Sequence, residues 1–122
     1  MRDRIKLGDN IIQGYKAVGG AYEAVYGTLT SSKTTFSTTM PADCFVNVQV
    51  FIMGDKDNGN NRNIRLDING SYAGSLVSYA TANQWCTLCF PLKSGDVLKL
   101  TANYIGTYTW YYEIHRFWYK GD

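Results

Sequence analysis

Apolar and polar side chains alternate with a period of two along most of this chain. In the segment FVNVQVFIM, Val46, Val48 and Val50 share one face, and Asn47 and Gln49 lie on the other. Successive side chains of a β-strand point to opposite faces, so this period is typical of strands that are half-buried in antiparallel sheets. The pattern therefore predicts an all-β fold.

The same alternation recurs in NIRLDI and in VLKLTANY, where the predicted inward face consists of Leu98, Leu100, Ala102 and Tyr104. Turn-forming runs such as NGS, KSGD and IGT separate these segments. The expected strands lie near residues 22–30, 34–40, 44–53, 62–69, 72–80, 84–90, 96–104 and 108–119. Short strands in this number and spacing predict an eight-stranded antiparallel jelly-roll β-sandwich with little or no helix.

A chain of 122 residues is expected to form one domain. We assign residues 21–122 to the jelly roll and residues 1–20 to an N-terminal lead-in segment with room for one short strand. No apolar run approaches the roughly 18 residues of a membrane span. The first ten residues, MRDRIKLGDN, lack the hydrophobic centre of a secretory signal peptide. The sequence thus predicts no signal peptide and no membrane insertion.

Charge and residue types disfavour nucleic-acid binding and catalysis. The formal net charge is +2, and the basic residues are scattered, so no nucleic-acid-binding stripe is expected. The single histidine, His115, limits general acid–base chemistry, and no G-x-S-x-G elbow occurs. A pair of scattered carboxylates of the glycosidase kind stays open. We therefore interpret the chain as a non-enzyme that needs no cofactor, with His115 in a structural role.

No metal site is expected, although two sets of residues offer weak alternatives. Asp55, Asp57 and Asn61 have the opening spacing of a calcium loop, but Leu66 stands where that loop needs a bidentate glutamate. A zinc set would combine all the cysteines with the histidine. It is disfavoured because cysteines three apart on the expected strand QWCTLCF point to opposite faces. The odd cysteine count, three, instead favours free thiols.

Aromatic residues on the strands are the candidate ligand-binding groups. Exposed tyrosine and tryptophan beside asparagine and aspartate offer flat apolar faces for sugar rings and polar groups for hydroxyls. Trp85, Tyr72 and Tyr79 are the residues that this reasoning selects. The competing explanation is that aromatic residues simply fit strands well.

The last expected strand, YTWYYEIHRFWY, is aromatic on both faces. A strand in a two-layer sandwich ordinarily has one core face and one wet face, so this strand should be covered on both sides. In a domain of this size the second cover is most simply another subunit. The predicted interface residues are Tyr111, Glu113, His115, Phe117, Trp118 and Tyr119.

The segment FPLKSGDVLKLTANY (residues 90–104), followed by a long aromatic closing strand, resembles the jelly-roll heads of tumour-necrosis-factor-like and complement-type trimers. The matching positions are Pro91, Leu92, Lys93, Gly95, Asp96, Val97 and Leu98. Bacteriophage tail-fibre and receptor-binding heads look similar in their short length, their richness in Tyr, Asn, Gly and Thr, and their lack of a leader. The resemblance implies a homotrimer but carries over no receptor-contacting residue.

These observations lead to one principal hypothesis and two alternatives. The principal hypothesis is a virion structural or receptor-binding module, assembled in the host cytoplasm. Its expected partners are further copies of itself, other virion proteins and a host surface polysaccharide. One alternative is a monomeric carbohydrate-binding module associated with a glycan-degrading enzyme. The other is a capsid decoration protein without a ligand.

Overall fold

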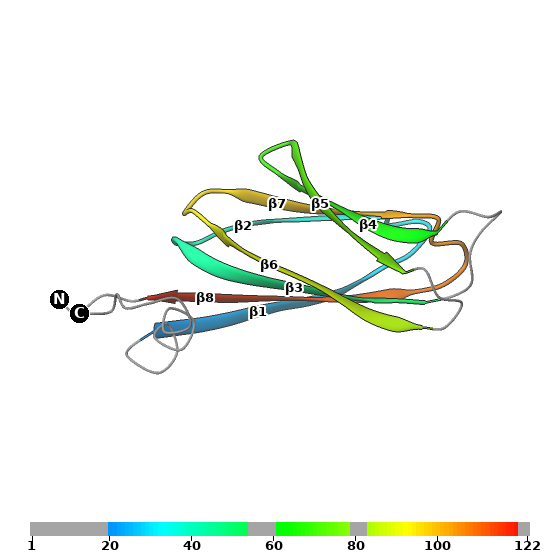
Figure 1. Cartoon of the computed structure of the whole chain (residues 1–122), viewed down its shortest axis with the longest axis horizontal. Coiled ribbons are helices and arrows are strands. Elements are labelled where there is room, and N and C mark those ends of the chain that lie inside the picture. The colour runs from blue at the N-terminus through cyan, green and yellow to red at the C-terminus, as the bar shows by residue number, and fades with distance from the viewer. Residues whose placement is uncertain (1–19, 54–60, 79–82, 120–122) are drawn as a thin grey trace.

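A computed structural model describes residues 20–53, 61–78 and 83–119 and confirms the all-β jelly-roll prediction (Figure 1). No helix occurs in these ranges, and so none that could cross a membrane. The strands are β1 (Gly20–Leu29), β2 (Thr35–Thr39), β3 (Cys44–Ile52), β4 (Arg62–Ile68), β5 (Ser71–Ser78), β6 (Gln84–Leu92), β7 (Val97–Asn103) and β8 (Trp110–Tyr119). Each falls where alternation predicted a strand. The predicted lead-in strand lies outside the described residues.

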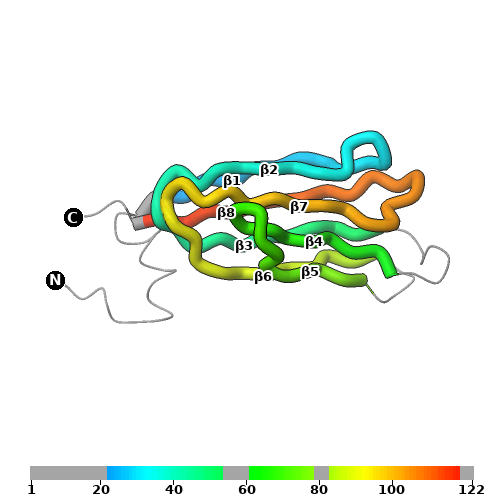
Figure 2. Tube along the Cα trace, turned by 90° about the horizontal axis from the view of Figure 1, so that it is seen from above, coloured from blue at the N-terminus to red at the C-terminus, as the bar shows by residue number. Residues whose placement is uncertain are grey.

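The strands form two antiparallel four-stranded sheets, in the orders β1-β8-β3-β6 and β2-β7-β4-β5 (Figures 1 and 2). Consecutive strands mostly alternate between the two sheets, which is how a jelly roll is wound. The edge strands β5 and β6, one from each sheet, contact each other, and the Cys86 thiol donates to the Val77 carbonyl oxygen over 3.7 Å. Gly20 pairs with Tyr119, so the chain enters the sandwich and leaves it at the same end.

The core lies between the two sheets and is built from the inward half of each alternation. On β3 every second residue from Cys44 to Ile52 is buried, as predicted for this strand. The largest side chain of the core is that of Trp110, which is fully buried and donates from Nε1 to the Met53 carbonyl oxygen over 3.0 Å. Met53 directly follows β3, so this bond ties the start of β8 to the end of the strand beside it in the same sheet.

Two details of the strand prediction need correction. Tyr104 was expected to face inward, but β7 ends at Asn103, and Tyr104 is exposed with a φ of 62°. A residue in the left-handed region leaves the strand and breaks the alternation. In addition, β6 runs two residues further than predicted, through Pro91 to Leu92. Proline lacks a backbone donor but is tolerated here because β6 is an edge strand of its sheet.

The turn between β6 and β7 is held by the carboxylate of Asp96. Its Oδ2 accepts from the Lys93 backbone N–H at 2.8 Å, and its Oδ1 accepts from Asn69 Nδ2 at 2.9 Å. Gly95 supplies the positive φ of 89° that this turn requires. The hydrogen bond from Lys93, then that from Asn69, lowers the pKa of Asp96 below its ordinary value.

We expect Asp96→Asn to destabilise the fold at neutral pH, and we expect this loss of stability to disappear in acid. Because the folded-state pKa is depressed, the carboxylate stabilises the fold above its unfolded pKa of about 3.9, and this contribution disappears as the pH falls through the folded pKa. Urea unfolding at neutral pH and near pH 3 would show a stability difference between wild type and variant that shrinks in acid. A difference that stays constant would contradict this role for Asp96.

Candidate functional site

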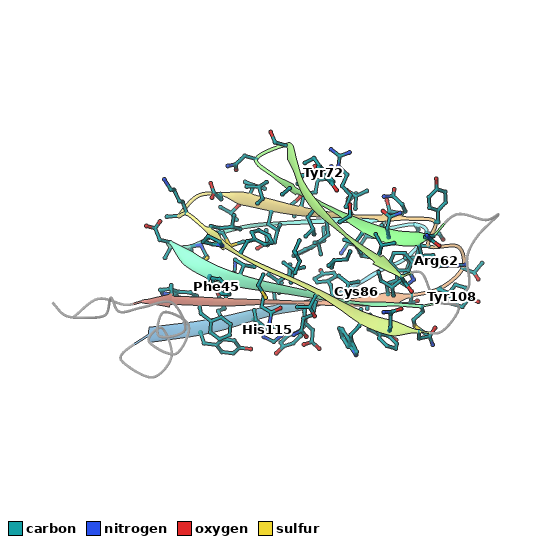
Figure 3. The ribbon with its side chains drawn as sticks, in the orientation of Figure 1. Phe45, Arg62, Tyr72, Cys86, Tyr108 and His115 are labelled. Atoms are coloured by element: carbon teal, nitrogen blue, oxygen red, sulfur yellow. The ribbon has the colours of Figure 1, made fainter. Side chains whose placement is uncertain are left out.

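The outer surface of the β1-β8-β3-β6 sheet is the candidate functional site, and we call it the aromatic face. The strand register arranges its outward residues in cross-strand rows that run from β1 to β6. The rows are Tyr22–Phe117–Phe45–Pro91, Ala24–His115–Asn47–Cys89, Tyr26–Glu113–Gln49–Thr87 and Thr28–Tyr111–Phe51–Trp85. Phe45 and His115 mark this surface in Figure 3.

The first and last rows of the aromatic face are rich in aromatic rings. In the first row the rings of Tyr22 and Phe117 pack with centroids 4.9 Å apart. In the last row Phe51 packs against Trp85 with centroids 5.2 Å apart, and Tyr111 lies beside Phe51 on β8. Trp85 and Tyr111 are each 48% exposed. Large rings on the wet side of a sheet are unusual in a monomer and favour an interaction surface.

The two middle rows are polar and partly bonded to one another. His115 Nε2 lies 3.0 Å from Glu113 Oε1, and His115 Nδ1 lies 2.5 Å from the Tyr22 hydroxyl. Since a carboxylate only accepts, Nε2 donates to Glu113, and in the neutral ring Nδ1 accepts from Tyr22. Burial, followed by a hydrogen bond with Tyr26, raises the pKa of Tyr22. Next to His115, the Oδ1 atom of Asn47 is buried and has no hydrogen-bond partner.

The predicted interface residues divide between the two faces of β8. Tyr111, Glu113, His115 and Phe117 lie together on the aromatic face. Trp118 does not, because alternation turns it to the opposite side, where it packs against the core. The side chain of Tyr119 lies outside the described set.

The predicted ligand-binding residues are not brought together. Trp85 lies on the aromatic face, whereas Tyr72 lies on the outer surface of the other sheet, on the opposite side of the sandwich (Figure 3). There the Arg65 guanidinium is 5.0 Å from the centre of the Tyr72 ring, and Ser75 hydrogen-bonds the Tyr72 hydroxyl over 2.9 Å. Tyr79 is outside the described residues. Trp85 and Tyr72 therefore cannot contact one small ligand.

Sequence reasoning missed the aromatic residues that β1 and β3 contribute to this surface. Tyr22 and Tyr26 are two strand positions from Ala24, and Phe45 and Phe51 flank the polar pair of β3. Each pair follows the period of two and so could have been assigned to a single face. Their position beside β8 depends on pairing between distant parts of the chain.

The metal alternatives gain no support in the described part of the chain. Asp55 and Asp57 lie outside it, and the Asn61 carbonyl oxygen accepts from Asn63 Nδ2 over 3.2 Å. Within residues 20–53, 61–78 and 83–119, no three His, Cys, Asp or Glu side chains are grouped closely enough to hold a metal ion. Cys44 and Cys89 face opposite sides of the β1-β8-β3-β6 sheet, and burial raises the pKa of both thiols.

No protein-family model and no curated protein matches the sequence. Among solved structures, the globular domain of zebrafish complement 1qA aligns with a TM-score of 0.55 at 11% identity, covering 83% of this chain and 98% of that one. The Drosophila NLP core, whose structure addresses pentamer formation and histone binding, aligns with a TM-score of 0.53 at 11% identity, covering 82% and 100%. These two likenesses show a shared fold and confirm the complement-type resemblance at that level.

A β-glucosidase from Paenibacillus barengoltzii aligns less well, with a TM-score of 0.48 at 19% identity. The alignment covers 74% of this chain but only 10% of the β-glucosidase, so the chain spans about a tenth of that protein.

Proposed function

We propose that this jelly roll is a subunit of a homotrimeric virion module, whose subunits meet through the aromatic face. The observation that carries the proposal is the composition of that face. Rings such as Trp85 and Tyr111 are half-exposed beside a polar centre, the two middle rows, in which Asn47 Oδ1 is buried without a hydrogen-bond partner. Tyrosine, tryptophan and phenylalanine are enriched in protein interfaces relative to the rest of the surface.

The polar centre explains why the partner would be a specific one. A buried amide oxygen without a partner, such as Asn47 Oδ1, is unfavourable and becomes satisfied when a donor is supplied from outside. Glu113 and His115 occupy successive outward positions of β8, beside Gln49 and Asn47 of β3, and provide a fixed pattern of charge and hydrogen bonding. Such groups set the register of an interface more than its affinity.

The wider role that we propose is receptor binding by a phage tail or head fibre, with a host surface glycan as the ligand. Support comes from the sequence resemblance described above and from the free thiols, which suit assembly in a reducing cytoplasm. The module is proposed to act by binding, not catalysis, and to contact other virion proteins.

Hydroxyl-radical footprinting of the intact protein tests whether the aromatic face is covered. Tyr26, which is 64% exposed in the single chain, and Trp85 should be protected from oxidation at high protein concentration. Tyr72, which is 60% exposed on the opposite sheet, provides the matched control and should remain reactive. Equal oxidation of all three at every concentration would contradict the proposed interface.

A monomeric carbohydrate-binding module remains the second candidate because of the tilted pair formed by Phe51 and Trp85. Their interplanar angle of 43° gives the end of the aromatic face an angled apolar surface on which a sugar ring could stack. Under this alternative, Trp85→Ala should weaken glycan binding and leave the solution mass unchanged. Under the trimer proposal, the same change should weaken assembly. A glycan array and light scattering, each applied to the wild type and to Trp85→Ala, separate the two candidate functions.

A further inference from the structure

Arg62, the first residue of β4, is a buried arginine whose charge is not neutralised by any described carboxylate. Only 6% of the residue is exposed. It lies with Tyr108 at the end of the sandwich away from the start of β1 and the end of β8 (Figure 3). The chain therefore enters and leaves at one end, and Arg62 is at the other.

Two nitrogens of the Arg62 side chain, Nε and Nη1, are buried without a hydrogen-bond partner. The other buried arginine provides a direct comparison. Arg116 is also 6% exposed, but its Nη2 donates to Glu23 Oε1 over 2.6 Å and its Nη1 donates to Thr38 Oγ1 and the Thr39 carbonyl oxygen. A charge held away from water without a counter-ion is unfavourable for folding. Arg62 thus has a stability cost that Arg116 largely avoids.

The surroundings of Arg62 suit a ligand that carries both a negative charge and an apolar face. The guanidinium carbon lies 5.4 Å from the centre of the Tyr108 ring, and that ring is 38% exposed. A Cβ atom added to the exposed Gly106 would be 3.9 Å from both Arg62 Nη2 and the Tyr108 ring, so Gly106 lies beside both groups and places no side chain between them. Tyr104, the residue after the last paired position of β7, is exposed as well.

We infer that Arg62 binds the carboxylate of an acidic sugar, with Tyr108 and Tyr104 supplying rings for the sugar to stack on. The inference rests on the proposed receptor-binding function and specifies its ligand class. Guanidinium groups bind carboxylates through paired donors, and tyrosine rings pack against the C–H faces of sugars. An acidic peptide would satisfy the charge, but it has no need of the exposed Tyr108 ring beside the guanidinium. The acidic sugar therefore accounts for more of the site.

The test compares Arg62→Met with the matched control Arg65→Met, using the full chain in each case. Arg65 is on the same strand but is exposed and bonded to Asp67 over 2.9 Å. The probes are 3′-sialyllactose, its carboxyl methyl ester and lactose, measured by titration calorimetry, with galacturonic acid trimers and their methyl esters as a second acidic series. We expect each acid to bind more tightly than its ester, and Arg62→Met to weaken acid binding roughly 10- to 100-fold. Arg65→Met should leave binding unchanged.

Thermal unfolding of the same variants separates a ligand-binding role from a structural one. Arg62→Met should not lower the melting temperature, because it removes buried unpaired donors and keeps the length of the side chain. A clear loss of stability would mean that Arg62 pairs within its own chain, and would overturn the inference.

Equal binding of acids and esters, binding of neither, or binding of an oligoglutamate peptide alone would also overturn it. None of these outcomes bears on assembly, so a trimer that fails them leaves the proposed interface standing. A monomer that binds the acids through Arg62 would support the inference about Arg62 and contradict the proposed subunit interface.

Discussion

Trp110→Ala is expected to destabilise the domain by about 3–5 kcal/mol, because it opens a large cavity in the core. The side chain is fully buried, and its neighbours in the packed core can collapse only partly into the space that it leaves. The change also leaves the Met53 carbonyl oxygen without the donor that now lies 3.0 Å away. Since domains are typically stable by only about 5–15 kcal/mol, this single change should remove a large part of the total.

Two further variants divide that effect into its parts. Trp110→Phe keeps most of the volume but lacks the indole donor, so it should be destabilising by less than the alanine variant. Tyr111→Ala alters the next residue of β8, which faces outward and is 48% exposed, and should have little effect on the stability of an isolated subunit. Urea unfolding followed by tryptophan-independent circular dichroism measures all three. Equal stability losses for Trp110→Ala and Tyr111→Ala would contradict the assigned inner and outer faces of β8.

Phe51→Lys is expected to have the largest effect on assembly. Phe51 lies in the aromatic face between Tyr111 on β8 and Trp85 on β6, so a lysine there places a charge at the centre of an aromatic row. Changes at central aromatic positions of interfaces commonly reduce the binding free energy by about 2 kcal/mol or more, which corresponds to roughly 30-fold weaker association. Sedimentation velocity over a concentration series should show monomers where the wild type is assembled.

The matched control for this experiment is Tyr72→Lys, on the outer surface of the other sheet. It introduces the same charge at an aromatic residue that is more exposed than Phe51, and it should leave assembly intact. Circular dichroism of both variants establishes that neither change unfolds the subunit. If Tyr72→Lys dissociates the protein and Phe51→Lys does not, the interface lies on the β2-β7-β4-β5 sheet.

The strands were predictable because alternation is a local property of the chain. Val46, Val48 and Val50 identify both the strand and its inner face without any knowledge of its neighbours. In the sequence, Tyr104 continues the period-two alternation of VLKLTANY, but its backbone leaves the strand at that point. A short run of alternating residues does not show where pairing stops.

The sites were harder to predict because they depend on residues that are distant in sequence. His115 meets the Tyr22 hydroxyl across 93 positions, and only the pairing of β1 with β8 brings them together. Trp118 was placed in the interface because it is aromatic, although its strand position turns it toward the core. Arg62 could not be identified from the sequence, since a lone arginine at the start of a strand is ordinary until its burial is known.

The mass of the protein in solution tests the central claim most directly. Light scattering coupled to size-exclusion chromatography should give about three times the chain mass of 13.7 kDa at micromolar concentrations. Five times the chain mass would retain a subunit interface but contradict the threefold arrangement. A single chain mass of 13.7 kDa across that range would contradict the proposal that the aromatic face joins subunits.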